Sequence, residues 1–151
     1  MLEETLAGKY KHLPQFRLPE VVYFVTWCLA DRNDELLPQE REIVAKTITL
    51  WHEDRYRLAA YVVMDDHVHV MVLPLPPNEL GQILHSWKGY TSKAINGLRG
   101  TRGKRWQKSS YTEIMRNERE IREKVSYILR NPERRWPAAG SYRWAAMFDV
   151  F

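Results

Sequence analysis

The sequence is poor in cysteine, in long apolar runs and in repeats. Its 151 residues contain one cysteine, Cys28, which excludes a disulfide framework and is typical of a reducing cytoplasm. No apolar run approaches the roughly 18 residues that a membrane span needs. The first 16 residues lack the apolar core of a signal peptide. We therefore expect a cytoplasmic protein outside the membrane, folded as one domain over residues 1–151.

Positive charge is concentrated in the second half of the chain. Residues 88–135 contain 14 lysines and arginines against 5 aspartates and glutamates, whereas the rest of the chain contains 9 against 14. The excess of nine positive charges within 48 residues is typical of a protein that binds a polyphosphate partner. For any single residue, a solvated helix face is an equally good explanation.

Hydrophobic patterning predicts four strands and three helices. We expect strands over residues 21–30, 58–64, 67–73 and 111–116, and helices over 38–54, 78–96 and 117–130. Asn78 and Asn117 are the expected helix caps, and Pro132 is expected to end the last helix. Residues 1–20 form an irregular lead-in, 97–110 a basic loop without an apolar anchor, and 133–151 a C-terminal tail.

The order of these elements predicts an α+β fold of the ferredoxin-like (split βαβ) type. Strand, helix, two strands, helix and strand build an antiparallel sheet with helices packed on one face. A further C-terminal helix follows the last strand and carries Tyr127. The second face of the sheet is either free or covered by this helix.

Two histidines begin the third predicted strand. Because side chains alternate along a strand, His67 and His69 project from one face and Val68 from the other. Two imidazoles at this spacing can bind one metal ion. The pair alone is weak evidence, but apolar residues on both sides of it disfavour two solvated histidines.

The last predicted helix carries Tyr127 and Asn131, which lie four residues apart and therefore share one face. Tyr127 has an alternative explanation as an amphipathic core residue, and Asn131 as a helix-terminal residue before a proline. Tyr111 is a second candidate nucleophile.

Taken together, these segments resemble a known family. YFVTWCLADR, YRLAAYVVMDDHVHVMVLP, ILHSWKGYTSKAIN, RWQ and YILRNP cover nearly the whole chain. They resemble the REP-associated tyrosine transposases of the HUH single-tyrosine transposase superfamily, which are related to the transposases of the smallest insertion sequences. One departure is Asp65, where the family usually has proline.

The resemblance implies roles for individual residues. Tyr127 matches the nucleophile that forms a 5′-phosphotyrosine intermediate on single-stranded DNA. His67 and His69 match metal ligands, and Asn131 matches a position, glutamine in the insertion-sequence relatives, that completes the metal site. The implied ion is magnesium or manganese, whereas two imidazoles alone favour zinc or manganese over magnesium. Because a free tyrosine has a pKa of about 10, a metal ion would help by polarising the scissile phosphate.

The implied partner is single-stranded or hairpin DNA, cut and rejoined at repeat hairpins by a monomer or a homodimer. The candidate DNA-binding cations follow the second helix and its basic loop: Lys88, Lys93, Arg99, Arg102, Lys104, Arg105, Lys108 and Arg116. Trp87, Tyr90 and Trp106 are either base-stacking residues or core residues, and for Trp87 and Tyr90 we favour the core.

Two other functions remain open. The first is a non-catalytic, ferredoxin-like nucleic-acid-binding module, although the sheet lacks the aromatic pattern of RNA-recognition modules. The second is a metallohydrolase that uses a water nucleophile, for which Asp65 and Asp66 are poorly placed as a base because both lie in a turn.

Overall fold

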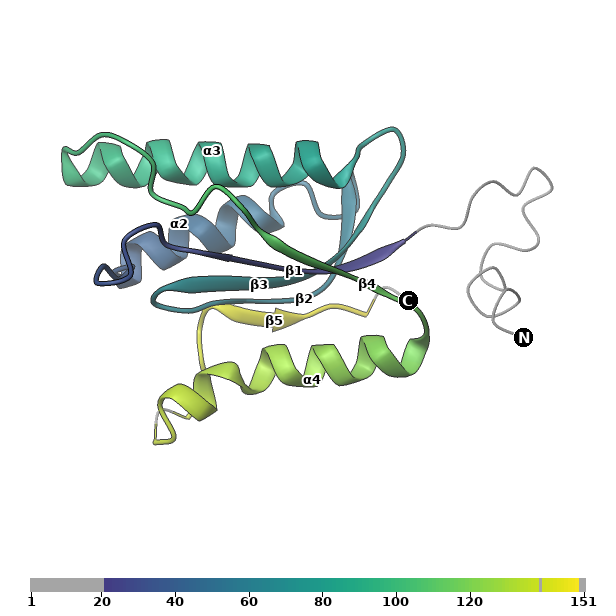
Figure 1. The fold of residues 1–151 in the computed structure, drawn as a ribbon. Helices are drawn as coiled ribbons and strands as arrows, with labels where there is room; N and C mark the ends of the chain where they lie inside the picture. Colours follow the sequence, from purple (N-terminus) through teal and green to yellow (C-terminus); the bar gives the residue numbers. More distant parts are fainter. Residues whose placement is uncertain (1–20, 139, 150–151) are drawn as a thin grey trace.

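The computed structural model describes residues 21–138 and 140–149, and the lead-in predicted for residues 1–20 lies outside them. The chain forms three layers, with α2 (Pro38–Thr49) and α3 (Leu80–Arg99) on one face of a sheet and α4 (Glu118–Arg135) on the other (Figure 1). The last helix therefore covers the face that the sequence left undecided. Within the described residues, no helix is both long and apolar enough to cross a membrane.

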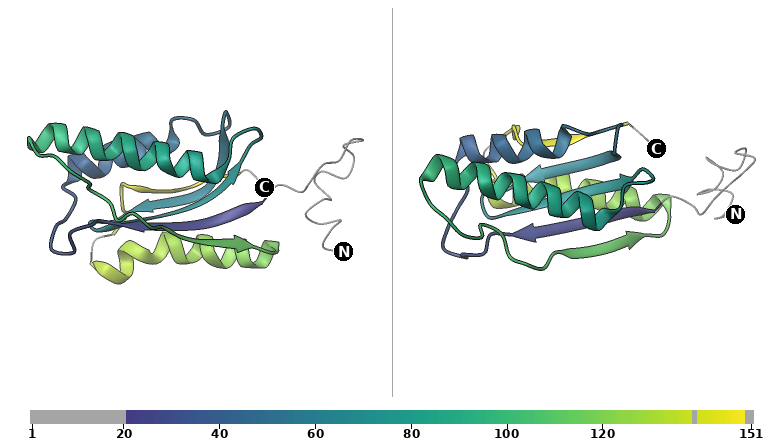
Figure 2. Two further views of the ribbon diagram at one scale, coloured as in Figure 1. Left: turned by 45° about the horizontal axis from the view of Figure 1, so that its top comes forward. Right: turned by 90° about the horizontal axis from the view of Figure 1, so that it is seen from above.

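The sheet has the strand order β4-β1-β3-β2-β5, and every paired neighbour is antiparallel. Its strands are β1 (Val22–Cys28), β2 (Tyr56–Val63), β3 (His67–Pro74), β4 (Tyr111–Met115) and β5 (Ala145–Met147). The first four strands and the first two helices have the predicted split βαβ connectivity, so the predicted α+β class is confirmed (Figure 2). The fifth strand was not predicted.

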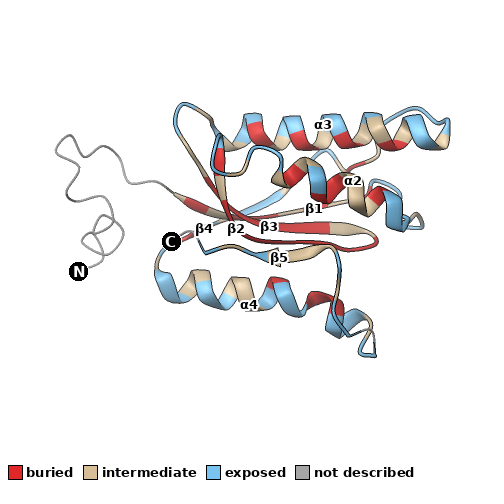
Figure 3. Cartoon of the chain, turned by 180° about the vertical axis from the view of Figure 1, so that it is seen from behind, coloured by how far each residue is buried: buried red, intermediate tan, exposed pale blue. Residues whose placement is uncertain are grey.

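Apolar side chains pack on both faces of the sheet. In the cartoon coloured by burial, buried residues lie along the central strands and on parts of the helices (Figure 3). Val68, Val70 and Val72 of β3 belong to the cluster beneath α2 and α3. Met71 and Leu73, which alternate with them, belong to the cluster beneath α4. This alternation decides which face each polar side chain of β3 reaches.

Two helix boundaries differ from the prediction. Helix α2 ends at Thr49 rather than at residue 54. Helix α3 begins at Leu80, because the Asn78 amide donates to the carbonyl of Leu75 instead of capping the helix. At the other end of α3, Gly100 takes a left-handed conformation (φ 69°), which glycine adopts without steric cost, and its N–H donates to the carbonyl of Asn96.

Helix α4 begins as predicted and ends later than predicted. The Asn117 side chain accepts a hydrogen bond of 2.9 Å from the N–H of Glu120. The Glu120 carboxylate accepts from the N–H of Arg116, one residue before the cap, whereas in a regular capping box it would accept from the cap residue itself. The helix continues through Pro132 to Arg135, three residues into the predicted tail. A proline inside a helix removes one main-chain hydrogen bond without always ending the helix.

The described residues of the tail after α4 include a strand at the β2 edge of the sheet. Strand β5 pairs with β2, and the Tyr142 hydroxyl donates to the carbonyl of Val63. The Trp144 indole donates to the carboxylate of Glu42 on α2. These aromatic residues are thus part of the folded domain.

Candidate active site and nucleic-acid interface

His67 and His69 lie on the face of the sheet that α4 covers. Their ring centroids are 4.6 Å apart. His69 is buried and stacks on Phe24 of β1 with a centroid distance of 5.3 Å. The two imidazoles are therefore side by side, with α4 above them.

Each imidazole has its Nδ1 atom engaged by a different neighbour. His67 Nδ1 donates to the Asp66 carboxylate at 2.7 Å. His69 Nδ1 lies 2.7 Å from the hydroxyl oxygen of Thr26, its register partner on β1. Neither Asp66 nor Thr26 was predicted as a site residue. The contact of Thr26 depends on the register between β1 and β3. In both rings the Nε2 atom takes no part in these contacts.

The environment keeps His69 neutral. Burial, together with the positive charges of Lys124 and Arg134 and the neighbouring His67, lowers the pKa of His69 to about 3. A neutral imidazole has a free lone pair and can bind a metal ion. Burial alone would raise the pKa of Asp66, but the hydrogen bond from His67 and the positive charges of Arg135 and Arg32 together lower it, so Asp66 is an ionised acceptor.

Helix α4 brings Tyr127 and Asn131 to these imidazoles. The Tyr127 ring centroid lies 5.4 Å from that of His69, and about two fifths of the tyrosine is exposed. Asn131 is buried, and its Oδ1 lies 3.3 Å from His67 Nε2. One chain therefore places a solvent-accessible phenol beside the paired imidazoles.

Two cations flank the Tyr127 phenol. The Arg134 guanidinium lies 4.5 Å from the centroid of the Tyr127 ring, and the Lys124 ammonium 5.4 Å from it. The same ammonium is 4.5 Å from the Phe24 ring centroid. The sequence prediction did not single out either cation. Both are placed to attract an anion towards the phenol.

The other candidate nucleophile, Tyr111, lies at the edge of the same face. Its ring meets Phe24 edge-on at a centroid distance of 6.3 Å, and its hydroxyl donates to Glu113. More than half of Tyr111 is exposed. Tyr111 thus contacts Phe24 and Glu113, whereas the ring of Tyr127 contacts that of His69.

The polar atoms around His67 fit a divalent cation. Because His67 Nδ1 donates to ionised Asp66, the neutral ring carries a lone pair on Nε2. The Asn131 amide nitrogen donates to the Tyr127 carbonyl at 3.3 Å, so its oxygen faces that lone pair. Two acceptors that face each other need a proton or a cation between them. In the described part of the chain, no three His, Cys, Asp or Glu side chains converge as a metal site, so this donor set depends on the amide.

The β2–β3 turn is fastened to the end of α4. Asp65 accepts from Arg135 at 3.0 Å. The carboxylate of Asp66 lies 3.7 Å from the same guanidinium. These ion pairs connect the strand that carries the imidazoles to the helix that carries the phenol.

The predicted DNA-binding cations fall into two groups. Lys93, Arg102, Lys104 and Lys108 are exposed along α3 and the basic loop. Lys88 is half-buried, and it donates to the Lys108 carbonyl and the Ser110 hydroxyl. Lys88, Lys104 and Lys108 line a cleft of ≈ 540 Å³ between α3 and the loop.

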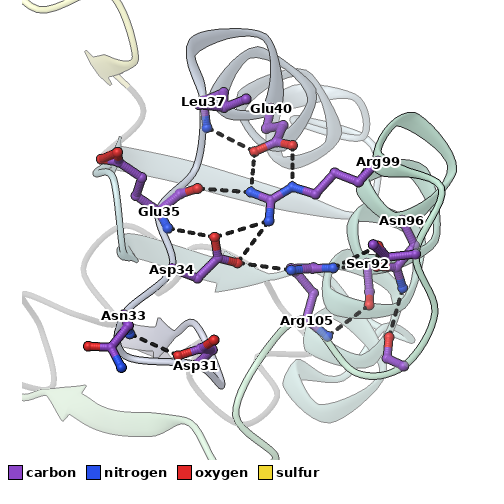
Figure 4. A network of polar contacts seen from close by, with 12 residues as sticks. Asp31, Asn33, Asp34, Glu35, Leu37, Glu40, Ser92, Asn96, Arg99 and Arg105 are labelled. Carbon is purple, nitrogen blue, oxygen red and sulfur yellow. Dashed lines mark hydrogen bonds and ion pairs between the residues drawn. The ribbon is translucent and has the colours of Figure 1, made fainter.

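The second group is paired with acidic side chains. Arg99 donates to both Asp34 and Glu40, and Arg105 donates to Asp34 (Figure 4). Arg116 is exposed and pairs with Glu120. Arg99 and Arg105 thus connect the end of α3 and the basic loop to the segment that begins α2, and their guanidinium groups face protein.

The ion pairs also lower two carboxyl pKa values. Burial raises the pKa of both Asp34 and Glu40, but the hydrogen bonds and charge of Arg99, together with backbone hydrogen bonds, leave both below their usual values. Glu40 is almost fully buried. Its charge is tolerated there because Arg99 bonds both of its oxygens.

Aromatic residues of α3 and the loop are mostly core residues. Trp87 and Trp106 are buried, and the Trp106 indole donates to Thr91. Trp106 therefore anchors the loop, contrary to the expectation of a loop without an apolar anchor. Tyr90, predicted on the apolar stripe, is 63% exposed. Of these three, Tyr90 alone presents its ring to solvent for stacking.

The family of the chain follows from comparison with known proteins. Residues 18–131 match the family model described as "Transposase IS200 like", and the chain belongs to this family. No curated protein sequence matches the chain.

Two solved structures share the fold. One is a REP-associated tyrosine transposase bound to a REP hairpin, with 23% identity, a TM-score of 0.65 and coverage of 87% of this chain and 88% of that chain. Another, from Deinococcus radiodurans, is provisionally described as a transposase, with 16% identity, a TM-score of 0.53 and coverage of 76% and 92%. At these identities the likeness concerns the fold, and the resemblance expected from the sequence motifs is confirmed at the level of the family.

Proposed function

We propose that the protein is a metal-dependent, single-strand DNA endonuclease and strand transferase that acts at repeat hairpins through a 5′-phosphotyrosine intermediate. The observation that carries the proposal is the contact between the rings of Tyr127 and His69, which joins a nucleophile and a metal-ligand pair within one chain. Membership of the IS200-like transposase family supports the same chemistry.

The proposed reaction is a transesterification. The Tyr127 oxygen forms a bond to the phosphorus of a DNA phosphodiester while the bond to the 3′-oxygen breaks. The phenol loses its proton, and the 3′-oxygen leaves as a hydroxyl. Because one phosphoester replaces another, the reverse step rejoins DNA without an external energy source. Lys124 and Arg134, beside the Tyr127 ring, would attract the scissile phosphate and offset its negative charge.

His67, His69 and Asn131 are the residues that would hold a magnesium or manganese ion. The ion would supply a Lewis acid for the scissile phosphate. Asp66 and the turn–helix ion pair with Arg135 would keep the strand and the helix in register around it. The amide oxygen makes the site harder than two imidazoles alone, which supports magnesium or manganese over zinc.

The proposed DNA is single-stranded or hairpin DNA, as in the solved relative that is bound to a REP hairpin. Lys88, Lys93, Arg102, Lys104 and Lys108 would contact its backbone, since they are the predicted cations that no carboxylate pairs in the described residues. The contact between Tyr127 and His69 occurs within a single chain, which supports a monomer as sufficient for cleavage.

The test is a covalent adduct. Wild-type protein incubated with labelled hairpin DNA and Mn²⁺ should give a protein–DNA band on a denaturing gel, and Tyr127→Phe should give none. Tyr111→Phe is the matched control and should keep the band, and both variants should still bind DNA. An adduct in Tyr127→Phe, or its loss in Tyr111→Phe alone, would overturn the assignment. If wild-type protein binds hairpin DNA with no adduct and no response to metal, the protein is a binding module.

A further inference from the structure

The two imidazoles of the site are oriented by side chains of different kinds. His67 Nδ1 faces the carboxylate of Asp66, which only accepts hydrogen bonds, so its proton position is determined. His69 Nδ1 faces the Thr26 hydroxyl at 2.7 Å, which can either donate or accept. The direction of this second bond decides whether His69 Nε2 carries a proton or a lone pair.

We infer that Thr26 is a positioning residue that accepts the Nδ1 proton of His69 and so leaves the Nε2 lone pair free for the metal ion. The inference rests on the proposed function. Thr26 acts through His69, so it is not itself a catalytic residue.

The packing around His69 supports this arrangement. The ring is held between strands, because Thr26 and His69 are register partners and the ring stacks on Phe24 at 5.3 Å. A threonine on a strand has a restricted χ1 angle, which fixes the position of its hydroxyl oxygen. The ring therefore cannot turn away from Thr26 without losing its contacts with β1.

Nearby charge keeps the His69 ring neutral. Lys124 lies 4.5 Å from the Phe24 ring on which His69 stacks, and Arg134 lies over the Tyr127 ring. After burial and the neighbouring His67, these positive charges lower the pKa of His69 and so disfavour a second proton on its ring. One of its two nitrogens therefore carries a lone pair, and the contact with Thr26 decides which one.

Side chains that orient metal-binding histidines typically change metal affinity by 10- to 100-fold when they are removed. Thr26→Val keeps the shape of threonine and removes the hydroxyl, so Mn²⁺ affinity of the full-length protein should fall by at least about 10-fold. Thr26→Ser restores the acceptor and should recover most of that affinity. Thr47→Val is the matched control, because this hydroxyl donates to the Ile43 carbonyl on α2, on the other side of the sheet. It should bind Mn²⁺ as the wild type does.

The measurement is free Mn²⁺ by electron paramagnetic resonance during titration. Equal affinity in wild type and Thr26→Val would overturn this inference and leave the proposed function standing. Absence of Mn²⁺ binding by the wild type would overturn both. A loss that Thr26→Ser does not recover would also overturn the inference, because serine supplies the hydroxyl that the inference requires.

A second measurement needs no variant. Nitrogen-15 NMR of the histidine side chains in metal-free wild-type protein should show His69 protonated at Nδ1 and unprotonated at Nε2. The opposite tautomer would overturn the inference even if Thr26→Val fails to fold.

Discussion

The Nε2 atom of His67 on β3 and the Oδ1 atom of Asn131 on α4 lie 3.3 Å apart, although 64 residues separate them in the chain. Two elements that are far apart in the sequence thus contribute neighbouring hydrogen-bond acceptors to one site. The site is complete only when α4 packs on the sheet, because this packing brings both Asn131 and Tyr127 to the histidines.

This pair leads to a prediction for Asn131. Asn131→Ala removes the amide oxygen, so Mn²⁺ affinity should fall by about 10-fold or more, on the scale seen when metal-site groups are removed. Asn131→Gln keeps an amide on the same helix face and should retain more affinity than Asn131→Ala. Titration with Mn²⁺ checks both. If Asn131→Ala binds as tightly as the wild type, then the amide is not a ligand.

The predicted cation Arg99 should matter for folding rather than for DNA. Arg99→Ala leaves the buried Glu40 carboxylate without its main partner, and we expect a loss of about 3 kcal/mol in the free energy of unfolding. The exposed Arg102 is the control, since Arg102→Ala should change stability by less than about 0.5 kcal/mol. Urea unfolding measures both. Equal stability of the two variants would contradict a structural role for Arg99.

The same ion pairs set a pH dependence of stability. Asp34 and Glu40 have folded-state pKa values below their ordinary values of 3.8 and 4.5. A lowered carboxyl pKa stabilises the folded state above the unfolded pKa, and this stabilisation is lost as pH falls through the folded value. Stability should therefore decline below about pH 4.5. Unfolding by urea at pH 7, 5, 4 and 3 should show a shallower decline in Arg99→Ala, and parallel curves would contradict this explanation.

The exposed lysines of the basic loop should determine the salt dependence of DNA binding. For single strands the slope of log K against log salt is about −0.7 per neutralised phosphate. Lys104→Ala and Lys108→Ala should each reduce the slope by about this amount if each contacts one phosphate. The slope is measured from the binding of hairpin DNA at about 50 to 300 mM salt. Lys46→Ala is the control, because Lys46 lies on α2, outside the basic loop. An unchanged slope in both loop variants would exclude the loop from the interface.

Much of the fold was predictable because local patterns dominate in β1, β2, β3 and α4. Apolar alternation in the hairpin and the cap at Asn117 depend on neighbours in sequence, and both elements form where the pattern indicates. Strand β5 was missed because it has three residues and pairs only with β2, far away in the chain. The end of α4 was misplaced because Pro132 is tolerated in a helix that Arg135 ties to Asp65.

The part of the candidate site that lies in sequence motifs was predictable. His67, His69, Tyr127 and Asn131 stand out in the sequence, and the structure brings these four side chains together. The partners of basic residues were not predictable: Arg99 and Arg105 look like Lys104 in a charge count, but they face Asp34 and Glu40 across the fold. Thr26 was missed because the sequence does not state the register between β1 and β3, on which its contact with His69 depends.

The pairing of Thr26 with His69, and of Cys28 with His67, has a further consequence. A one-residue slip between β1 and β3 would turn every side chain of the shifted strand to the opposite face. Inserting or deleting a single residue inside either strand would separate the hydroxyl from the imidazole, even if each individual residue were retained. Divergence within these two strands should therefore proceed by substitution at constant length, while the connections outside them are free to grow or shrink.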